Sequence, residues 1–421
     1  MIQRIKSSTY TKNFFWLSLD FISKLVIVTF ANFFIFNSLT KSDYGIISFL
    51  NNIIFLLFPV VSFGSNLTFL KRFSATNDNE FLNIEFSKGF SIRFMISCLT
   101  FCILIILYFM NLIELYVFIL FLNLCFELLY IYRELFLAKN NNVYQTISNF
   151  ISDLFFLTAI YFLYKLQLLN IFYLCIVYSV RSLFRLFIYS YYAFFNLKLK
   201  LQFVIDFDYF YKIFKESYPL IFSSVASIFT IVLAQFLIKS KIGDNELGIF
   251  SASYYLVSLL MTFFSIYSNS LVAYTFKNRK EKKMNSKIIF LIFYSSVIII
   301  LFILIFGNKI LPYFLSNTFI ESIKILFYFS PYILIICFKP IIDKLIVFNG
   351  DSDALARRNI FNLFFTSILI YFLLENNFTY KFIPFCFFIS ELIILASYSL
   401  FNRTKYVFME IKDGIFKFPF K

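Results

Sequence analysis

Long apolar stretches recur along the whole chain, separated by short segments rich in polar and charged residues. A stretch of roughly 17 to 25 residues, rising about 1.5 Å per residue as an α-helix, is long enough to cross the hydrocarbon core of a membrane. The pattern therefore predicts an all-α membrane protein with about twelve transmembrane helices. The predicted spans are residues 14–36, 45–63, 86–109, 112–132, 147–164, 171–195, 217–238, 248–272, 287–306, 324–347, 360–374 and 382–400.

Three of the prolines inside these spans are expected to interrupt helices. Pro59 lies in the second span, and Pro331 and Pro340 lie in the tenth. Because proline removes a backbone donor, we expect kinks in those two helices. A broken helix that lines a cavity is a feature of many transport sites. The fourth span has no proline, and we expect no matching break there.

The composition indicates that lipid is the solvent for much of the surface. The 421 residues are 61% hydrophobic and 14% charged, with a mean hydropathy of +0.82. Soluble chains are usually about 45–50% apolar and about a quarter charged. A compact soluble domain would still expose a large part of this apolar surface to water.

The chain has no histidine, which excludes histidine-dependent catalysis and histidine-ligated metal sites. Its six cysteines all lie in apolar runs, so we interpret them as small hydrophobic residues rather than disulfide or metal partners. We therefore expect no enzymatic activity, no cofactor and no metal site.

The 38 lysines and arginines predict the orientation of the chain. If the N-terminus is cytoplasmic, most of them fall in inner segments, as the positive-inside rule requires. Both termini are therefore predicted to be cytoplasmic. The densest basic cluster is the inner loop 277–283, which we interpret as a topology signal beside anionic lipid head groups and not as a nucleic-acid site.

A short motif occurs once in each half of the chain. Asp43-Tyr44-Gly45-Ile46-Ile47-Ser48 precedes the second span, and Glu246-Leu247-Gly248-Ile249-Phe250-Ser251 precedes the eighth. Six helices separate the two copies, and because six is even the halves share one orientation. We predict two parallel six-helix bundles, residues 1–200 and 201–421, around a central cavity.

At these motifs the sequence resembles the Wzx-type polysaccharide flippases, within the superfamily that also contains the MATE exporters. Segments 39–48, 217–224 and 242–254 carry the resemblance. It implies a transporter that moves an undecaprenyl-diphosphate-linked oligosaccharide, such as an O-antigen repeat unit, from the inner to the outer leaflet of the bacterial inner membrane. The expected partners are this substrate, membrane lipids, a coupling ion (H+ or Na+) and other membrane proteins of polysaccharide assembly.

Charged side chains inside spans are functional candidates, because a charge near mid-bilayer is costly. Depth along the helices predicts that Lys24 and Arg181 lie near the midplane. Arg93 is predicted to lie closer to the inner face, where its long stem could bring the charge to water.

Arg181 and Arg185 are four residues apart and share one helix face, where their like charges would repel. This predicts an anionic partner. The two phosphates of a lipid diphosphate meet the requirement, because guanidinium groups bind phosphate oxygens in bidentate fashion. Carboxylates of neighbouring helices, such as Asp153 or Glu127, are the alternative partners.

Two sets of candidate residues follow, in a water-filled, cationic cavity that opens inward. The substrate-binding candidates are Lys24, Arg181, Arg185 and Lys339, and the ion-coupling candidates are Asp20, Glu127, Asp153 and Glu391. The i,i+4 spacing of Asp20 with Lys24, and of Lys339 with Asp343, also predicts local neutralisation within each pair.

Two other functions remain open. A MATE-type exporter of small cations would share the fold, but its cavity should be dominated by acidic residues, whereas this chain has at least as many basic candidates. A polysaccharide polymerase would also span the membrane many times. Such enzymes need a long outer loop, and the longest one predicted here, residues 307–323, has an ordinary length.

Overall fold

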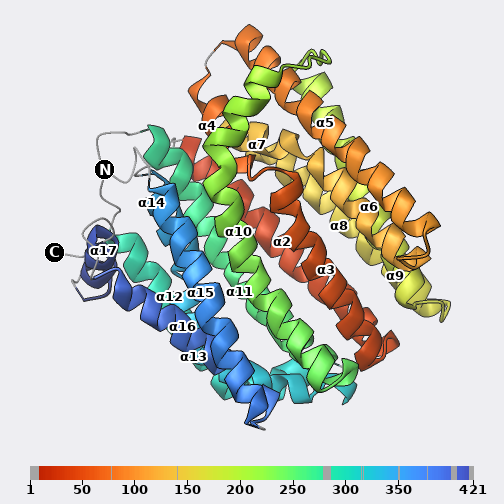
Figure 1. Ribbon diagram of the computed structural model, residues 1–421, viewed down its shortest axis with the longest axis vertical. Helices are drawn as coiled ribbons and strands as arrows, with labels where there is room; N and C mark the ends of the chain where they lie inside the picture. Colours follow the sequence, from red (N-terminus) through yellow and green to blue (C-terminus); the bar gives the residue numbers. More distant parts are fainter. Residues whose placement is uncertain are drawn as a thin grey trace. The chain divides into compact units, whose positions relative to one another are not determined.

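The computed structural model describes residues 9–76, 78–139, 141–277, 286–313, 315, 317–348, 351–376, 378–399 and 405–416, and every regular element within them is a helix (Figure 1). The α-helices are α2 (Thr9–Ser38), α3 (Lys41–Val61), α4 (Asn66–Ala75), α5 (Asn79–Phe109), α6 (Leu115–Leu128), α7 (Ile131–Ala138), α8 (Asn142–Lys165), α9 (Ile171–Tyr191), α10 (Phe207–Lys241), α11 (Asp244–Lys277), α12 (Ser286–Ile310), α13 (Glu321–Ile336), α14 (Lys339–Phe348), α15 (Ser352–Glu375), α16 (Ile383–Ser397) and α17 (Lys405–Phe416). A π-helical segment, η1 (Tyr192–Asn196), extends α9, and three short 3-10 segments are η2 (Leu311–Tyr313), η3 (Asn317–Phe319) and η4 (Tyr380–Phe382).

Eleven of the described helical stretches are long and apolar enough to cross a membrane. The all-helical membrane fold is therefore confirmed, with eleven spans found against about twelve predicted. The predicted span 248–272 lies in α11, which is not among the eleven although its 34 residues exceed the roughly 20 that a span needs. The predicted basic loop 277–283 lies outside the described residues, apart from Lys277.

The chain packs into two compact units. Unit 1 comprises Met1–Leu39 and Leu50–Val225, and unit 2 comprises Thr40–Phe49 and Ala226–Lys421. Two helices are divided between the units, because α3 begins in unit 2 and continues in unit 1, whereas α10 begins in unit 1 and continues in unit 2. The two predicted bundles, with their boundary at residue 200, stay a prediction.

In unit 1 the long helices lie side by side in a row (Figure 1). Helix α8 packs against both α2 and α9, α9 packs against α6, and α6 packs against α5. The short helices α4 and α7 pack on each other over a core rich in aromatic side chains. The central rings of this core are Phe69, Phe73, Phe86, Tyr132 and Phe136.

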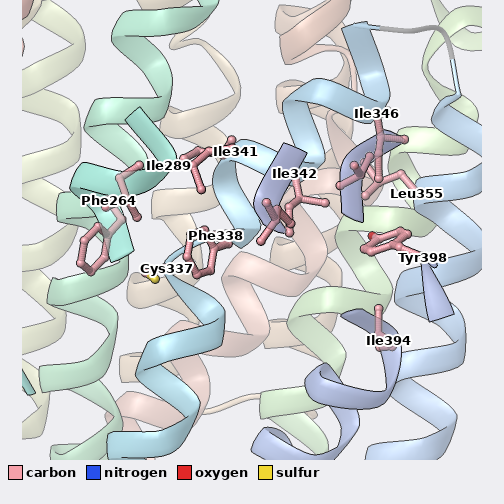
Figure 2. Close-up of a cluster of buried hydrophobic side chains, with 13 residues drawn as sticks. Phe264, Ile289, Cys337, Phe338, Ile341, Ile342, Ile346, Leu355, Ile394 and Tyr398 are labelled. Carbon is pink, nitrogen blue, oxygen red and sulfur yellow. The ribbon is translucent and has the colours of Figure 1, made fainter. Parts of the chain in front are cut away.

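In unit 2, α13 packs against α11, α12 and α16, and α15 packs against α14 and α16. A cluster of buried apolar side chains joins these helices (Figure 2). Cys337 and Phe338 lie within it, between α13 and α14. The charged side chains of unit 2 that are described below lie on α14, α15 and α16.

The tenth predicted span is broken, as Pro340 led us to expect. Helix α13 ends at Ile336, and α14 begins at Lys339. Pro340 occupies the first turn of α14, a position where a helix loses nothing by lacking a backbone donor. Pro331 lies inside α13 and Pro59 inside α3, and both helices continue past their proline.

The fourth predicted span is also broken, so the expectation of no break there was wrong. Helix α6 ends at Leu128 and α7 begins at Ile131. Side chains of α5 bind carbonyls that the break frees: Arg93 Nη1 lies 3.4 Å from the Leu128 oxygen, and Ser97 Oγ lies 2.9 Å from the Cys125 oxygen. A helix can break inside a membrane without proline when neighbouring side chains satisfy its backbone in this way.

Arg93 does not reach water as predicted, since its side chain is only 2% exposed. Its Nη2 atom donates to Ser65 Oγ at 2.8 Å and to Asn66 Oδ1 at 2.6 Å. Arg93 therefore joins the start of α4 to the break between α6 and α7.

The two copies of the repeated motif contact each other within unit 2. A Cβ atom built on Gly45 would lie 2.8 Å from the Gly248 nitrogen, so only glycine allows the first turns of α3 and α11 to approach this closely. Gln235 of α10 bridges the copies, with Nε2 at 3.4 Å from Ser48 Oγ and 3.0 Å from Ser251 Oγ.

Candidate functional site

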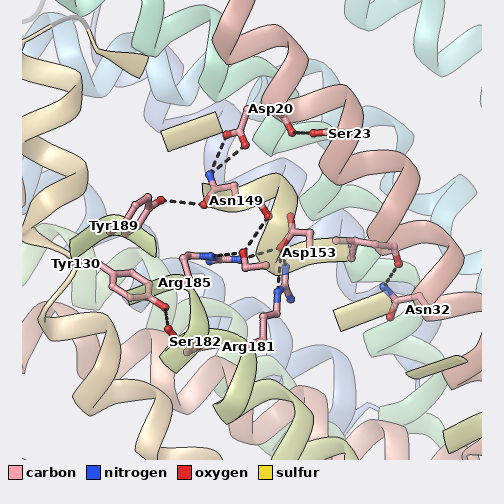
Figure 3. A network of polar contacts seen from close by, with 12 residues as sticks. Asp20, Ser23, Asn32, Tyr130, Asn149, Asp153, Arg181, Ser182, Arg185 and Tyr189 are labelled. Atoms are coloured by element: carbon pink, nitrogen blue, oxygen red, sulfur yellow. Dashed lines mark hydrogen bonds and ion pairs between the residues drawn. The ribbon is translucent and has the colours of Figure 1, made fainter. Parts of the chain in front are cut away.

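Helix α9 begins at an N-cap, where the Asn170 side chain accepts from the Tyr173 amide at 3.0 Å. Arg181, Arg185 and Tyr189 then recur at four-residue spacing and share one face of the helix. This face meets polar groups of α8 (Figure 3).

Both arginines bind one carboxylate, Asp153 of α8 (Figure 3). Arg181 donates to Oδ1 from Nε at 3.0 Å and from Nη2 at 2.5 Å, and Arg185 donates to the same oxygen from Nη2 at 2.9 Å. The predicted alternative of pairing with a carboxylate is confirmed for Asp153. The Asp153 side chain is 1% exposed, but those of Arg181 and Arg185 are 13% and 17% exposed.

The arginines retain unused donors. Arg185 Nε binds Ser152 Oγ at 3.1 Å, so the hydrogen bonds among the described residues occupy Nε and Nη2 of each guanidinium. Nη1 of each has no hydrogen-bond partner in the part of the chain that the structure describes. Two partly exposed cations thus share one buried carboxylate and can bind a further anion.

Asp20 of α2 binds an amide instead of a cation. Its two carboxylate oxygens accept from Asn149 Nδ2 at 3.1 and 3.2 Å, and the Tyr189 hydroxyl donates to Asn149 Oδ1 at 2.9 Å. Within the described residues Lys24 makes no ion pair within 4.0 Å, so it does not contact Asp20, although the two charges act on each other. Lys24 still lies near enough to Asp153 to interact with its charge.

Glu127 is the penultimate residue of α6, directly before the helix break, and is half-buried. Among the described residues it makes no ion pair within 4.0 Å, and Arg185 is the strongest charge acting on it. Three cationic candidates of unit 1, Lys24, Arg181 and Arg185, therefore lie near Asp153, and Arg181 and Arg185 contact it.

A second polar cluster lies in unit 2, centred on Glu391 of α16. Its carboxylate accepts from Arg358 Nη2 at 3.1 Å and from Asn362 Nδ2 at 2.8 Å, both on α15. Lys339 Nζ lies 3.5 Å from the same carboxylate and donates to Ser227 Oγ of α10 at 2.7 Å. The predicted candidates Lys339 and Glu391 are thus brought together.

Lys339 and Asp343 make no ion pair within 4.0 Å, although the charge of Lys339 acts on Asp343. Asp343 instead accepts from Arg358 Nη1 at 2.7 Å. The four charges of Lys339, Asp343, Arg358 and Glu391 sum to zero. Partners from other helices satisfy these groups better than a neighbour one turn away on the same helix.

A small polar cavity borders this second cluster. It is lined by Ser227, Thr230, Ile231, Tyr254, Tyr332, Lys339, Asn362, Phe387 and Glu391. Its volume of about 20 Å³ can hold a water molecule, but it is too small for a sugar.

Comparison with known proteins gives the chain its family. The model of the family described as "Polysaccharide biosynthesis protein" matches residues 10–274, more than half of the sequence. The chain belongs to this family. The predicted resemblance to Wzx-type proteins is thereby confirmed at the family level. No curated protein matches the chain significantly.

The family member has the fold of MOP-superfamily transporters. A MOP superfamily transporter from Pyrococcus furiosus aligns over 96% of both chains with a TM-score of 0.74 and 10% identity. A multidrug resistance MATE family transporter in an outward-facing conformation aligns over 97% of both chains with a TM-score of 0.74 and 11% identity. The family is therefore one of polysaccharide biosynthesis, and the fold is the multi-pass helical fold of these transporters.

Each unit of this family member places its polar cluster beside a broken helix. In unit 1, Tyr130 lies in the break between α6 and α7, and its hydroxyl donates to the Ser182 oxygen of α9 at 2.7 Å. In unit 2, Lys339 is the first residue of α14, directly after the break. Arg181 of α9 and Glu391 of α16 carry opposite charges, and each binds a charged partner on a neighbouring helix.

Arg358 is the functional candidate that sequence reasoning missed. It lies two residues before the predicted span 360–374, but α15 begins at Ser352, so Arg358 is already a buried helical residue. The signal was the polar stripe Arg358, Asn362 and Thr366, whose four-residue spacing predicts a single helix face.

Proposed function

We propose that the protein is a flippase that moves an undecaprenyl-diphosphate-linked oligosaccharide from the inner to the outer leaflet of the bacterial inner membrane. Membership of a polysaccharide biosynthesis family supports a cargo of this class. The observation that carries the proposal is the pair Arg181 and Arg185, two cations within a membrane span that share the single carboxylate of Asp153. Both termini are proposed to be cytoplasmic.

Asp153 acts in this proposal as the anion that occupies the arginines when no cargo is bound. A diphosphate offers more negative charge and more acceptor oxygens than one carboxylate, so it competes for the guanidinium donors. The free Nη1 groups of Arg181 and Arg185 provide the first contacts, and Lys24 adds a third positive charge nearby. The polyprenyl tail stays in lipid while the head group crosses.

The carboxylates that best fit ion coupling are those without a cation in contact. Asp153 and Glu391 each contact two cations, which oppose the binding of H+ or Na+. Asp20, bonded to an amide, and Glu127, with no ion pair within 4.0 Å among the described residues, are therefore the preferred coupling residues.

A MATE-type exporter of small cations remains the alternative, and the described charges argue against it. Its site would need acidic residues in excess, but Asp153 and Glu391 each contact two cations. The related Pyrococcus furiosus transporter is described as having a binding pocket of reverse polarity that suggests a different function. Pocket polarity is accordingly a reasonable guide to cargo within this fold.

The double variant Arg181→Gln/Arg185→Gln tests the proposal. We expect surface polysaccharide to disappear while the lipid-linked oligosaccharide accumulates in the inner leaflet, because the diphosphate loses both guanidinium groups. Arg133→Gln, which removes an exposed arginine of α7, is the matched control and should leave polysaccharide unchanged. Normal surface polysaccharide in the double variant, at normal protein levels, would reject the diphosphate role.

A further inference from the structure

The linker between η1 and α10, residues 197–206, is not helical, and its residues 200–204 bind lengthwise along α5. Three of its backbone amides, at every second residue, donate to side chains of α5 that are one helical turn apart. The pairs are Lys200 N with Asn83 Oδ1 (3.4 Å), Gln202 N with Ser87 Oγ (3.1 Å) and Val204 N with Ser91 Oγ (3.0 Å).

The spacing of the two partners explains this arrangement. Two residues of extended chain advance about 6.6 Å, and four residues of an α-helix advance about 6 Å. The amides of Lys200, Gln202 and Val204 therefore stay in register with polar side chains four residues apart on α5. Non-helical backbone requires such internal partners wherever water is scarce.

The side chains between these bonds are apolar and point away from the protein. Leu201, Phe203 and Ile205 are 37%, 55% and 52% exposed. Phe203 packs edge-on against Phe94, with ring centroids 5.9 Å apart, and Phe94 lies among the exposed apolar residues of the α5 span. The linker thus continues the lipid-facing surface of α5.

Exposed lysines flank this apolar strip at Lys198, Lys200, Lys212 and Lys215. The nearby carboxylates are mostly paired with other helices: Asp206 binds Lys88 at 2.7 Å, and Glu216 binds Arg72 at 2.9 Å. The four lysines are therefore balanced within the segment by Asp208 alone, and they make it locally cationic.

We propose that residues 197–215 form an interfacial anchor that binds anionic phospholipid. The apolar side chains of the linker enter the boundary between head groups and acyl chains, and the flanking lysines contact lipid phosphates. The anchor is a site distinct from the Arg181 and Arg185 cluster, and it does not depend on the identity of the cargo.

Tryptophan fluorescence tests the anchor directly. The chain has one tryptophan, Trp16, so the variant Trp16→Phe/Phe203→Trp reports on the linker alone. The variant is reconstituted in two membranes of the same lipid composition, with bromine on phosphatidylglycerol in one and on the same mole fraction of phosphatidylcholine in the other. Its tryptophan emission should be quenched more strongly by the brominated phosphatidylglycerol. Adding Lys198→Gln and Lys200→Gln should remove that difference.

The control is Trp16→Phe/Leu99→Trp, which places the reporter on the exposed apolar face of α5, away from the four lysines. Both brominated lipids should quench it equally. A Phe203→Trp reporter that is quenched by aqueous iodide and not by either lipid would overturn the interfacial placement. A reporter that neither iodide nor either lipid quenches would overturn it too, because it would indicate that a protein docks on this surface. Equal quenching by the two lipids at position 203 would overturn the preference for anionic lipid.

Discussion

Asp153 is the side chain on which the charges of unit 1 depend. It is almost fully buried, and one of its oxygens accepts from both Arg181 and Arg185. Removing one partner of a buried ion pair is far more costly than replacing the whole group, because the remaining charge is left uncompensated. Asp153 should therefore matter for stability as well as for cargo binding.

Asp153→Asn should destabilise the protein by roughly 3–5 kcal/mol, since it leaves two guanidinium groups without a buried counter-charge. Thermal unfolding of the purified protein in detergent measures the loss. The triple variant Asp153→Asn/Arg181→Gln/Arg185→Gln should recover much of it, because no unpaired cation remains. A single variant as stable as the wild type would contradict the shared-carboxylate account.

At the residue scale, the sequence predicted only some of the partners of the buried charges. Spacing placed Arg181 and Arg185 on one face and offered Asp153 as a partner, which is correct. Spacing also suggested that Lys339 pairs with Asp343, but Glu391, which is remote in sequence, binds Lys339 instead. Contacts between helices depend on packing, and helix periodicity carries no information about them.

At the element scale, the close approach of α3 and α11 depends on two glycines. A Cβ atom on Gly248 would overlap the carbonyl group of Lys41, which is backbone and cannot rotate away. At Gly307, by contrast, the nearest atoms belong to the flexible side chain of Phe327 at 3.1 Å. The two positions therefore make a matched pair for substitution.

Gly248→Ala should separate the first turns of α3 and α11 and break the bridge that Gln235 makes between Ser48 and Ser251. We expect a lower melting temperature and reduced surface polysaccharide. Gly307→Ala is the control, expected to stay near wild type in both measurements. Equal behaviour of the two variants would argue against a required backbone contact at Gly248.

A second element-scale prediction concerns the linker and pH. Hydrogen bonds from Lys88 and from the Tyr209 amide lower the pKa of Asp206 below its ordinary value. Because the pKa of Asp206 is lower in the folded state than its unfolded value of about 3.9, the ionised carboxylate stabilises the folded contact above that unfolded value. This stabilisation is lost as the pH falls through the lowered folded pKa. The protection factors for amide hydrogen exchange in residues 197–206, which correct for the pH dependence of the intrinsic rate, should thus stay high down to about pH 4 and fall in more acidic buffer.

Asp206→Asn supplies the comparison. This variant should show faster exchange in the linker already at neutral pH, because Lys88 has lost its anionic partner. Asp208→Asn, which removes a nearby exposed carboxylate, should behave as the wild type. Unchanged exchange in Asp206→Asn would indicate that the amide bonds to α5 hold the linker without the ion pair.

Of the two helix breaks, the sequence predicted one and not the other. Pro340 predicted the break before α14, because a missing donor is visible in the sequence. The break between α6 and α7 has no such mark. Its cause lies on α5, where Arg93 and Ser97 bind freed carbonyls, and only the packed structure brings these side chains to the break.

At the scale of the whole molecule, the repeat in the sequence predicts two related halves. Each unit has a polar cluster beside a broken span, and the two copies of the motif around Gly45 and Gly248 contact each other. The sequence could not predict which helices supply the partners in each cluster, since these contacts depend on how the helices pack.

The orientation of the whole chain stays a prediction that reporter fusions can check. A green fluorescent protein fused after Lys421 should fluoresce, and alkaline phosphatase fused between α8 and α9, near Gln167, should be active. Both results follow if lysine and arginine are concentrated on the cytoplasmic side. Active phosphatase at the C-terminus would reverse the assignment and with it the proposed inner leaflet entry.

The interrupted fourth span also has a mechanical consequence. Bending an intact helix inside a membrane breaks backbone hydrogen bonds that water cannot replace. Between α6 and α7 these backbone hydrogen bonds are already absent, and side chains of α5 bind the carbonyl oxygens of Leu128 and Cys125 in their place. Helices α6 and α7 can therefore bend relative to each other at the break. Tyr130 lies in the break and is hydrogen-bonded to α9, so a bend there would move the helix that carries Arg181 and Arg185.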